Sequence, residues 1–198
     1  MNQPPGNDDS GLIRAARAGD RDAFGLLVER HRDAVWRTVR RTLGSTADAE
    51  DAVQEVFIRA LVGLDRFDLR YPFAPWILRI AANYCIDRLR RRKTDRTRLW
   101  SDLSESEERR VLERMSTLPH AGEGEHDRGR YLEVARGLLE RLPAKRRMAF
   151  VLREIEGRDY AEVAAALGVP ETTARVRVWR ARHELHREFR KLEKKGEG

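Results

Sequence analysis

The sequence predicts an all-α protein made of two small helical domains joined by a flexible acidic linker. Apolar residues recur at three- and four-residue spacings along most of the chain, and no segment has the alternation of a strand of useful length. The helical spacing stops where Pro119, Gly122 and Gly124 interrupt a stretch rich in acidic residues. We therefore expect a disordered tail over 1–10, a first domain over 11–95, the linker over 96–130, a second domain over 131–192 and a second tail over 193–198.

The first domain begins with two long amphipathic helices. Asp20 is a suitable N-cap for a helix over about 21–43, and Gly44 follows in the position of a C-terminal stop. A second apolar stripe predicts a helix over about 47–64. Pro75 suits the first turn of a third helix, which we expect Asn83 to interrupt before a basic continuation.

The second domain ends in two helices joined by a tight turn. A leucine-rich helix ends at Pro143, and a short helix follows it. Asp159 and Glu162 form the pattern of a capping box, and Gly168 tolerates the positive φ that ends a helix. Pro170 fits the first turn of the last helix. That helix turns four apolar residues inward, namely Ala174, Val178, Ala181 and Leu185.

Basic residues cover the rest of the last helix. The segment 171–192 holds seven Lys or Arg residues and three Glu residues, and Thr172 and Thr173 stand at its N-terminal end. In a helix-turn-helix, the second helix lies in the major groove of DNA, and its N-terminal residues reach base edges. The pattern therefore predicts a DNA-binding hairpin. The alternative is an amphipathic hairpin with a solvated basic face.

The overall charge favours a polyanionic partner. The net charge of +7 and the isoelectric point near 10.0 would attract nucleic acid or an anionic membrane surface. No run of about 18 apolar residues predicts a membrane span, and the N-terminus lacks the features of a secretory signal. The single cysteine, Cys85, excludes an intrachain disulfide and fits a reducing compartment. We therefore expect a cytoplasmic protein.

Two oppositely charged segments distinguish the first domain. Residues 48–55 contain four acidic residues and no basic one, and Asp48, Asp51 and Glu55 share one helix face. Residues 88–98 contain seven Lys or Arg residues and one Asp. Such a domain could bind a protein with one face and nucleic acid with the other. A merely solvated surface is the alternative for the acidic face.

Aromatic residues precede the basic segment. Aromatic side chains near basic ones can stack on unpaired bases. Of Tyr71, Phe73, Trp76 and Tyr84, we expect Phe73 and Trp76 to fill the core and only Tyr84 to be exposed. Asn83 is placed to read a base edge, and its alternative is helix capping.

These segments, in this order, resemble bacterial RNA polymerase sigma factors of the extracytoplasmic-function type, which retain only regions 2 and 4. The resemblance covers about residues 12–95 and 131–190. The segment DAEDAVQEVFIRAL at 48–61 resembles region 2.2. The segment FAPWILRIAAN at 73–83, with Asp87 and the basic run after it, resembles regions 2.3 and 2.4. Region 4 is matched by the segments 142–154 and 173–182, together with Gly157 and Tyr160.

The resemblance implies a protein that directs transcription initiation without being an enzyme and without a cofactor. In the family, region 2.2 docks on the clamp helices of the largest subunit of core RNA polymerase, and region 4 contacts the flap of the second subunit. Regions 2.3 and 2.4 melt the −10 element of promoter DNA and capture a flipped base. Region 4 reads the −35 element as duplex. An anti-sigma protein is a common further partner in the family.

The resemblance also implies roles for individual residues. Four would bind the polymerase: Asp48, Asp51, Gln54 and Glu55. Six would bind the −10 element: Asn83, Tyr84, Asp87, Arg88, Arg91 and Arg92. Eight would bind the −35 element: Arg153, Tyr160, Thr172, Thr173, Arg175, Val176, Trp179 and Arg180.

Two other classes of function fit parts of the sequence. A free-standing DNA-binding regulator, usually a dimer, would leave the acidic face over 48–55 without a role. An enzyme would need a recognisable catalytic pattern, and the sequence has no Gly-rich phosphate loop, paired cysteines or nucleophile elbow. His183 and His186 are three residues apart, but no third ligand is in view, so we expect surface histidines and no metal site.

Overall fold

The computed structural model of the chain describes residues 9–99 and 134–196, so most of the expected linker and tails lies outside it. Within these ranges every regular element is a helix, which confirms the all-α fold class. The first range contains α1 (Asp9–Arg17), α2 (Arg21–Leu43), α3 (Thr46–Gly63), the 3-10 turn η1 (Leu64–Arg66) and α4 (Phe73–Leu99). The second contains a helix at 134–141, α7 (Ala144–Phe150), the π-helix η2 (Val151–Ile155), α8 (Tyr160–Leu167) and α9 (Glu171–Gly196). None of these helices is long and apolar enough to cross a membrane.

Both ends of α2 are formed by the residues that the sequence predicts. The Asp20 carboxylate accepts hydrogen bonds from the backbone amides of Asp22 at 2.9 Å and Ala23 at 3.1 Å. At the other end Gly44 adopts a φ of 84°, and its amide donates to the Arg40 carbonyl. Because α3 begins only two residues later, α2 and α3 pack directly on each other.

Two stretches are more helical than the sequence predicts. Asp9 and Ser10, expected in a disordered tail, begin α1, whose Ile13 is buried. The prediction that Asn83 interrupts the third helix is wrong, because α4 runs through it and continues to Leu99 inside the expected linker range. Asn83 itself is exposed, whereas Ala82 before it is buried in the core and Tyr84 after it is half-buried. Tertiary packing therefore overrides the weak helix preference of asparagine.

The helix-turn-helix is built as the sequence predicts. The Asp159 carboxylate accepts from the Glu162 amide at 2.7 Å, and the Glu162 carboxylate accepts from the Asp159 amide at 3.0 Å. This capping box starts α8, and Gly168, with a φ of 61°, ends it. Three of the inward-facing residues of α9 are fully buried and the fourth is half-buried: Ala174, Val178, Ala181 and Leu185.

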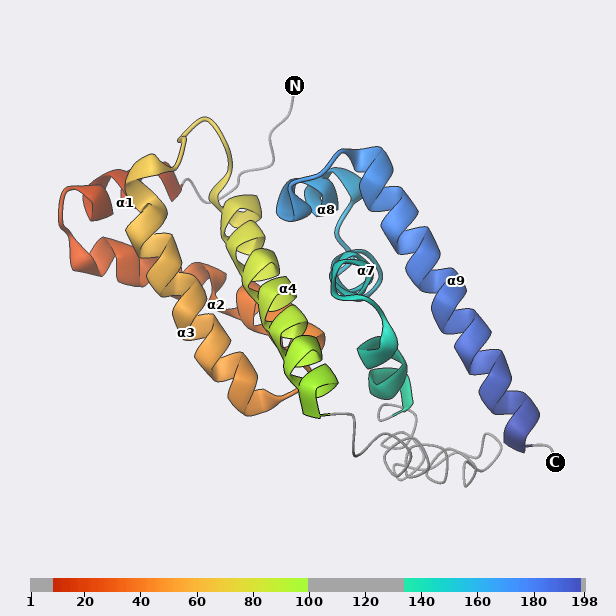
Figure 1. Ribbon diagram of the computed structural model, residues 1–198. Coiled ribbons are helices and arrows are strands. Elements are labelled where there is room, and N and C mark those ends of the chain that lie inside the picture. Colours follow the sequence, from red (N-terminus) through yellow and green to blue (C-terminus); the bar gives the residue numbers. More distant parts are fainter. Residues whose placement is uncertain (1–8, 100–133, 197–198) are drawn as a thin grey trace, which may run out of the picture.

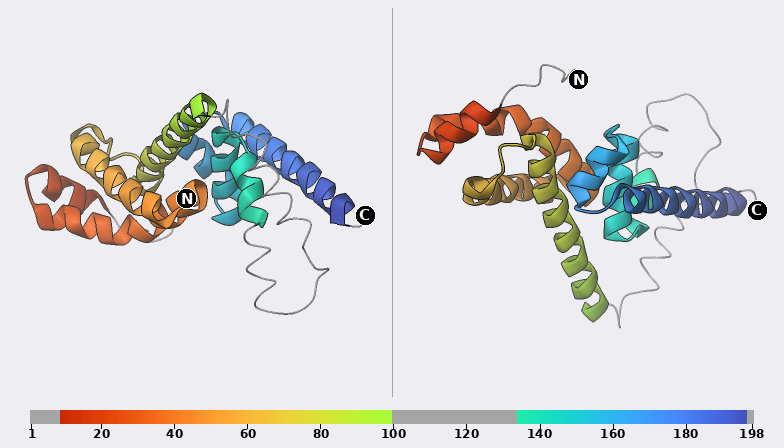
Figure 2. Two further views of the ribbon diagram at one scale, coloured as in Figure 1. Left: turned by 60° about the horizontal axis from the view of Figure 1, so that its bottom comes forward. Right: turned by 90° about the horizontal axis from the view of Figure 1, so that it is seen from above.

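We call residues 9–99 the first half and residues 134–196 the second half. Helix α4, the last helix of the first half, lies between the other helices of that half and the second half. Figure 1 shows α3 on one side of α4, α7 and α8 on the other and α9 at the outer edge, while α2 passes behind α4. The views in Figure 2 show the same order, with the C-terminal part of α4 projecting from the bundle. Buried apolar residues of both halves form one continuous core. The two helical units are therefore packed against each other, a contact that the sequence does not reveal.

Candidate nucleic-acid interface

A hollow of about 310 Å³ lies between α3 and α4. It is lined by one aromatic ring, one carboxylate and four guanidinium groups: Arg59, Tyr84, Asp87, Arg88, Arg91 and Arg92. Five of these are residues that the sequence assigns to −10 binding, so the structure brings them together. A ring beside several cations, in a space of this size, suits an unpaired base and its phosphates.

Arg59 supports the aromatic wall of this hollow. Its guanidinium carbon lies 5.0 Å from the centre of the Tyr84 ring, which is a cation–π geometry. Its Nε donates to Oε1 of Glu55, one turn earlier on α3, at 2.7 Å. Sequence reasoning missed Arg59 because its contact with Tyr84 depends on how α3 packs on α4, and no local pattern indicates that.

Asp48 connects the acidic segment with the basic one. Arg88 donates to Oδ1 of Asp48 at 2.7 Å, and Arg92 donates to Oδ2. The hydrogen bond from Arg92, followed by that from Arg88, holds the pKa of Asp48 well below its usual range. Asp48 in turn raises the pKa of Arg88. Asp48, which is predicted to bind the polymerase, is thus paired with Arg88 and Arg92, which are predicted to bind DNA.

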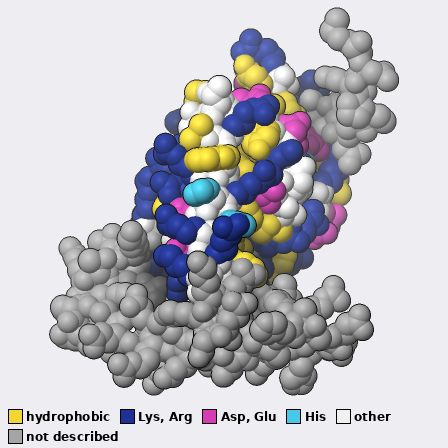
Figure 3. All heavy atoms as spheres, turned by 90° about the vertical axis from the view of Figure 1, so that its right-hand side faces the viewer, with side chains coloured by type: hydrophobic (Ala, Val, Ile, Leu, Met, Phe, Trp, Pro, Cys, Tyr) yellow, Lys and Arg dark blue, Asp and Glu magenta, His cyan; other side chains and the backbone are white. Residues whose placement is uncertain are grey.

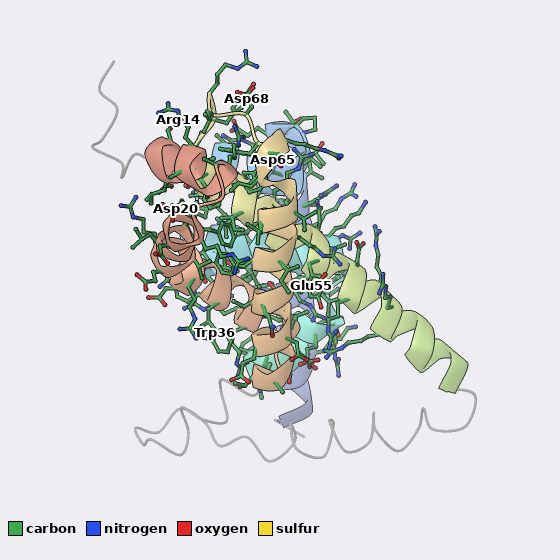
Figure 4. The ribbon with its side chains drawn as sticks, turned by 90° about the vertical axis from the view of Figure 1, so that its left-hand side faces the viewer. Arg14, Asp20, Trp36, Glu55, Asp65 and Asp68 are labelled. Atoms are coloured by element: carbon green, nitrogen blue, oxygen red, sulfur yellow. The ribbon has the colours of Figure 1, made fainter. Side chains whose placement is uncertain are left out.

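The other predicted polymerase-binding residues lie on the outer surface of α3. Asp51 and Gln54 are exposed, and Glu55 is half-buried. Figure 4 shows Glu55 on the side of α3 that faces outward. Further along the helix, three large apolar side chains are exposed: Ile58 to 49 %, Leu61 to 51 % and Val62 to 78 %. We call these six residues the outer strip of α3; such an amphipathic surface is typical of protein-binding sites.

The predicted −35 residues of α9 face solvent. Arg175 and Arg180 are exposed, and so are Val176 to 46 % and Trp179 to 64 %. The Trp179 ring stacks on His183 with 5.5 Å between ring centres. Figure 3 shows the face on which α9 lies, where basic side chains surround exposed apolar groups and histidine. At the N-terminal end of the helix, Thr172 is exposed and Thr173 is half-buried.

Tyr160 joins the remaining predicted −35 residues to α9. Two guanidinium groups lie over its ring, with Arg153 4.6 Å and Arg175 4.4 Å from the ring centre. Arg153 also donates to the Arg158 carbonyl at 2.8 Å, and Arg175 donates to Oε1 of Glu171 at 2.6 Å. Residues from η2, α8 and α9 therefore form one cluster at the start of the last helix, already held in place before any partner binds.

One predicted −10 residue lies outside the hollow, and one expectation about exposure is wrong. Asn83 is exposed on α4 but does not line the hollow. The expectation that only Tyr84 is exposed among the aromatic residues near the basic segment is wrong, because Tyr84 is half-buried and Tyr71 is 65 % exposed. Tyr71 precedes α4 in a loop, whereas Phe73 is buried and Trp76 packs on it with 5.3 Å between ring centres. In the described ranges, no cluster of His, Cys, Asp and Glu could hold a metal ion.

The chain is similar to known proteins over both of its helical units. The family models of Sigma-70 region 2 and Sigma-70, region 4 match residues 27–94 and 132–185. The ECF RNA polymerase sigma factor SigW of Bacillus subtilis is 33 % identical over 91 % of this chain and 96 % of its own length. SigM of Mycobacterium tuberculosis is 35 % identical over 90 % of this chain and 83 % of its own. The solved structure of CnrH with the cytosolic domain of CnrY covers 92 % of this chain and 97 % of CnrH, with a TM-score of 0.61 and 28 % identity.

The two matched regions and the fold define a transcription initiation factor that works with RNA polymerase. It binds the polymerase and promoter DNA and is not an enzyme. The chain belongs to the extracytoplasmic-function group of the sigma-70 family.

The Asp48 cluster gives a prediction about pH. Because the pKa of Asp48 is lowered in the fold, its ionised form stabilises the protein above the ordinary value of 3.8, and this contribution is lost as the pH falls toward the folded pKa. Asp48→Asn should lower the free energy of unfolding by about 1 kcal/mol at pH 7, the scale of a partly exposed charged hydrogen bond. The difference from the wild type should shrink below about pH 4.

Urea denaturation at pH 7, 4 and 3 measures this difference. Glu50→Gln, an exposed position on the same helix, is the matched control and should differ little from the wild type at any of these pH values. A loss in Asp48→Asn that is equal at pH 7 and pH 3 would contradict the ionic account.

Proposed function

We propose that this sigma factor opens promoters with three separate surfaces. The first unit, over 11–95, binds the clamp helices of the largest polymerase subunit with the outer strip of α3 and holds the melted −10 element in the hollow. The second unit, over 131–192, reads the −35 element as duplex with α9, and the linker over 96–130 joins the two. The main support is a base-sized, aromatic and cationic hollow on one unit together with an exposed recognition helix on the other.

The outer strip of α3 has the chemistry for docking on a basic helical surface. Asp51 and Glu55 supply negative charge, Gln54 lies between them, and the apolar end of the strip supplies surface to bury. Asp48 is already neutralised by two arginines. We therefore assign to Asp48 the positioning of Arg88 and Arg92, in addition to any contact with the polymerase.

The hollow would compensate for the cost of unpairing the −10 duplex. Extruding a base costs a few kcal/mol, which stacking on an aromatic ring and contacts from cations can offset. A flipped base would stack on the Tyr84 ring, which the Arg59 guanidinium also contacts. Asp87, and Asn83 one turn before it on the same exposed face, would accept or donate hydrogen bonds at the base edge. Three arginines of the hollow that the sequence assigns to the −10 element would contact phosphates: Arg88, Arg91 and Arg92. Arg91 is the most exposed of the three.

The last helix would read the −35 element from the major groove. Arg175 and Arg180 can donate to guanine, and Val176 and Trp179 can contact thymine methyl groups. Thr172 and Thr173 lie at the end of the helix that meets the edge of the groove, and Arg153 and Tyr160 would contact the backbone.

Two further partners follow from the family. Region 4 would also contact the flap of the second polymerase subunit. The structure of CnrH holds the cytosolic domain of CnrY, and we propose by analogy that an inhibitory anti-sigma protein covers this chain in the cytoplasm until a signal releases it.

The docking surface can be tested by charge reversal. Asp51→Arg should abolish run-off transcription with purified core polymerase, because it places a cation at the acidic end of the outer strip. Binding to a −35 duplex, selected beforehand with the wild-type holoenzyme, should be unchanged, because α3 and α9 lie on opposite sides of α4 (Figure 1). Glu29→Arg, an exposed position on α2, is the control and should initiate normally. Undiminished initiation by Asp51→Arg would remove the docking assignment.

The recognition helix can be tested at a single base pair. If Arg175 reads a base edge, Arg175→Ala should cost about 1–3 kcal/mol at one position of the −35 element and little elsewhere. Binding to a set of duplexes with single base-pair changes measures this. Arg187→Ala, near the far end of α9, should weaken all duplexes by a similar small factor. A uniform loss for Arg175→Ala as well would reassign Arg175 to the phosphates.

A further inference from the structure

Arg59 reaches the hollow from a different helix than the other residues that line it. Five of the six lining residues belong to α4, whereas Arg59 belongs to α3. Its side chain is 50 % exposed, and its Nε donates to Glu55 one turn earlier on the same helix. Within the described ranges, the two terminal nitrogens of this guanidinium have no hydrogen-bond partner. Glu55 therefore holds the stem of the group, while its outer end remains available to a ligand.

The Tyr84 ring, in contrast, is held in place. Tyr84 is half-buried and packs against the hydrophobic core. After Asp48, Tyr84 is the next side chain that raises the pKa of Arg88, so the phenol lies beside that arginine. Arg59 lies over the ring, and both side chains line the hollow. A base that enters the hollow and stacks on this ring therefore meets the Arg59 guanidinium.

The space between the ring and the guanidinium is close to what a base needs. The guanidinium carbon lies 5.0 Å from the ring centre. Flat groups in contact lie about 3.5 Å apart, so a base between the two would need a separation of about 7 Å. Arg59 would have to withdraw by only about 2 Å, which a long side chain achieves through small changes in its torsions. Because that side chain is half exposed, this movement disturbs no core contact.

The chemistry of Arg59 suits the second side of such a site. A guanidinium is flat and cationic, and it stacks on aromatic rings and on unpaired bases. Arg88 and Arg92 also line the hollow, but both are paired with the carboxylate of Asp48. Arg59 is bound only through Nε, so it can follow a base without giving up its contact with Glu55. A group already oriented by such a contact loses less freedom when a ligand arrives.

We propose that Arg59 is the second wall of the base site: an unpaired base enters between the Tyr84 ring and the Arg59 guanidinium, which closes on it as a clamp. This proposal rests on the proposed function, because it takes the hollow as the place that receives a base of the melted −10 element. Every base has a flat face, so the clamp holds a base without reading its identity. Identity is then left to groups that reach the base edge.

Two substitutions separate a clamp from a mere support for Tyr84. Arg59→Ala removes the side chain, whereas Arg59→Lys can still pair with Glu55 and place a cation on the Tyr84 ring but has no flat group. The measurement is the lifetime of open complexes, formed by each holoenzyme on a promoter selected with the wild type, after addition of heparin. Both variants should shorten this lifetime by about tenfold, the scale of one stacking contact.

A promoter without the captured base completes the test. An abasic site is placed at the −10 position where it shortens the wild-type lifetime most, and on this promoter both Arg59 variants should match the wild type within about twofold, because nothing is left to clamp. Arg91→Ala, which removes a cation from the same hollow, is the matched control and should shorten the lifetime on both promoters by the same factor.

Two results would overturn the clamp. One is a wild-type lifetime for Arg59→Lys on the intact promoter, which would leave Arg59 as a support for Tyr84. The other is a loss in Arg59→Ala that is equally large on the abasic promoter, which would assign Arg59 to the phosphates. In both cases the capture of a base would stand. If no abasic site in the −10 element shortens the wild-type lifetime, the proposed capture itself fails, and the clamp falls with it.

Discussion

The whole structure depends on the packing of α4 against neighbours on two sides. On one side it packs with α2 and α3 and forms a wall of the hollow; on the other it packs with α7 and α8. Ala81, Ala82 and Cys85 make this possible, because short side chains allow helices to approach closely. Burial raises the pKa of the Cys85 thiol to about 12, so this cysteine acts as a small apolar core residue and not as a nucleophile.

Some charged residues of this protein form ion pairs within the fold, and others are exposed on its surface. Asp48 orients Arg88 and Arg92 within the hollow, and Glu156 secures one half on the other. The outer strip of α3 and the exposed face of α9 remain for other molecules. The net charge of +7 therefore understates the local contrast, since the acidic and basic surfaces lie on different helices.

Local chemistry made much of the fold predictable. Asp20, Gly44, Asp159 and Gly168 act on residues within four positions of themselves, so helix ends could be placed from the sequence. What could not be placed depends on contacts between distant segments. Examples are the continuity of α4 through Asn83, the support of Tyr84 by Arg59, and the pairing of Asp48 with two arginines. The packing of the two halves against each other is the largest such feature. In the sequence, the apolar residues of α4 that are buried in this contact are indistinguishable from the core residues of a single small bundle.

The central claim, that Tyr84 holds an unpaired base in the hollow, is tested most directly by permanganate oxidation of thymines in the −10 element under wild-type and variant holoenzymes. Wild type and Tyr84→Phe should leave these thymines unpaired and reactive, whereas Tyr84→Ala should bind the promoter but leave them largely protected. Full reactivity under Tyr84→Ala would contradict the claim.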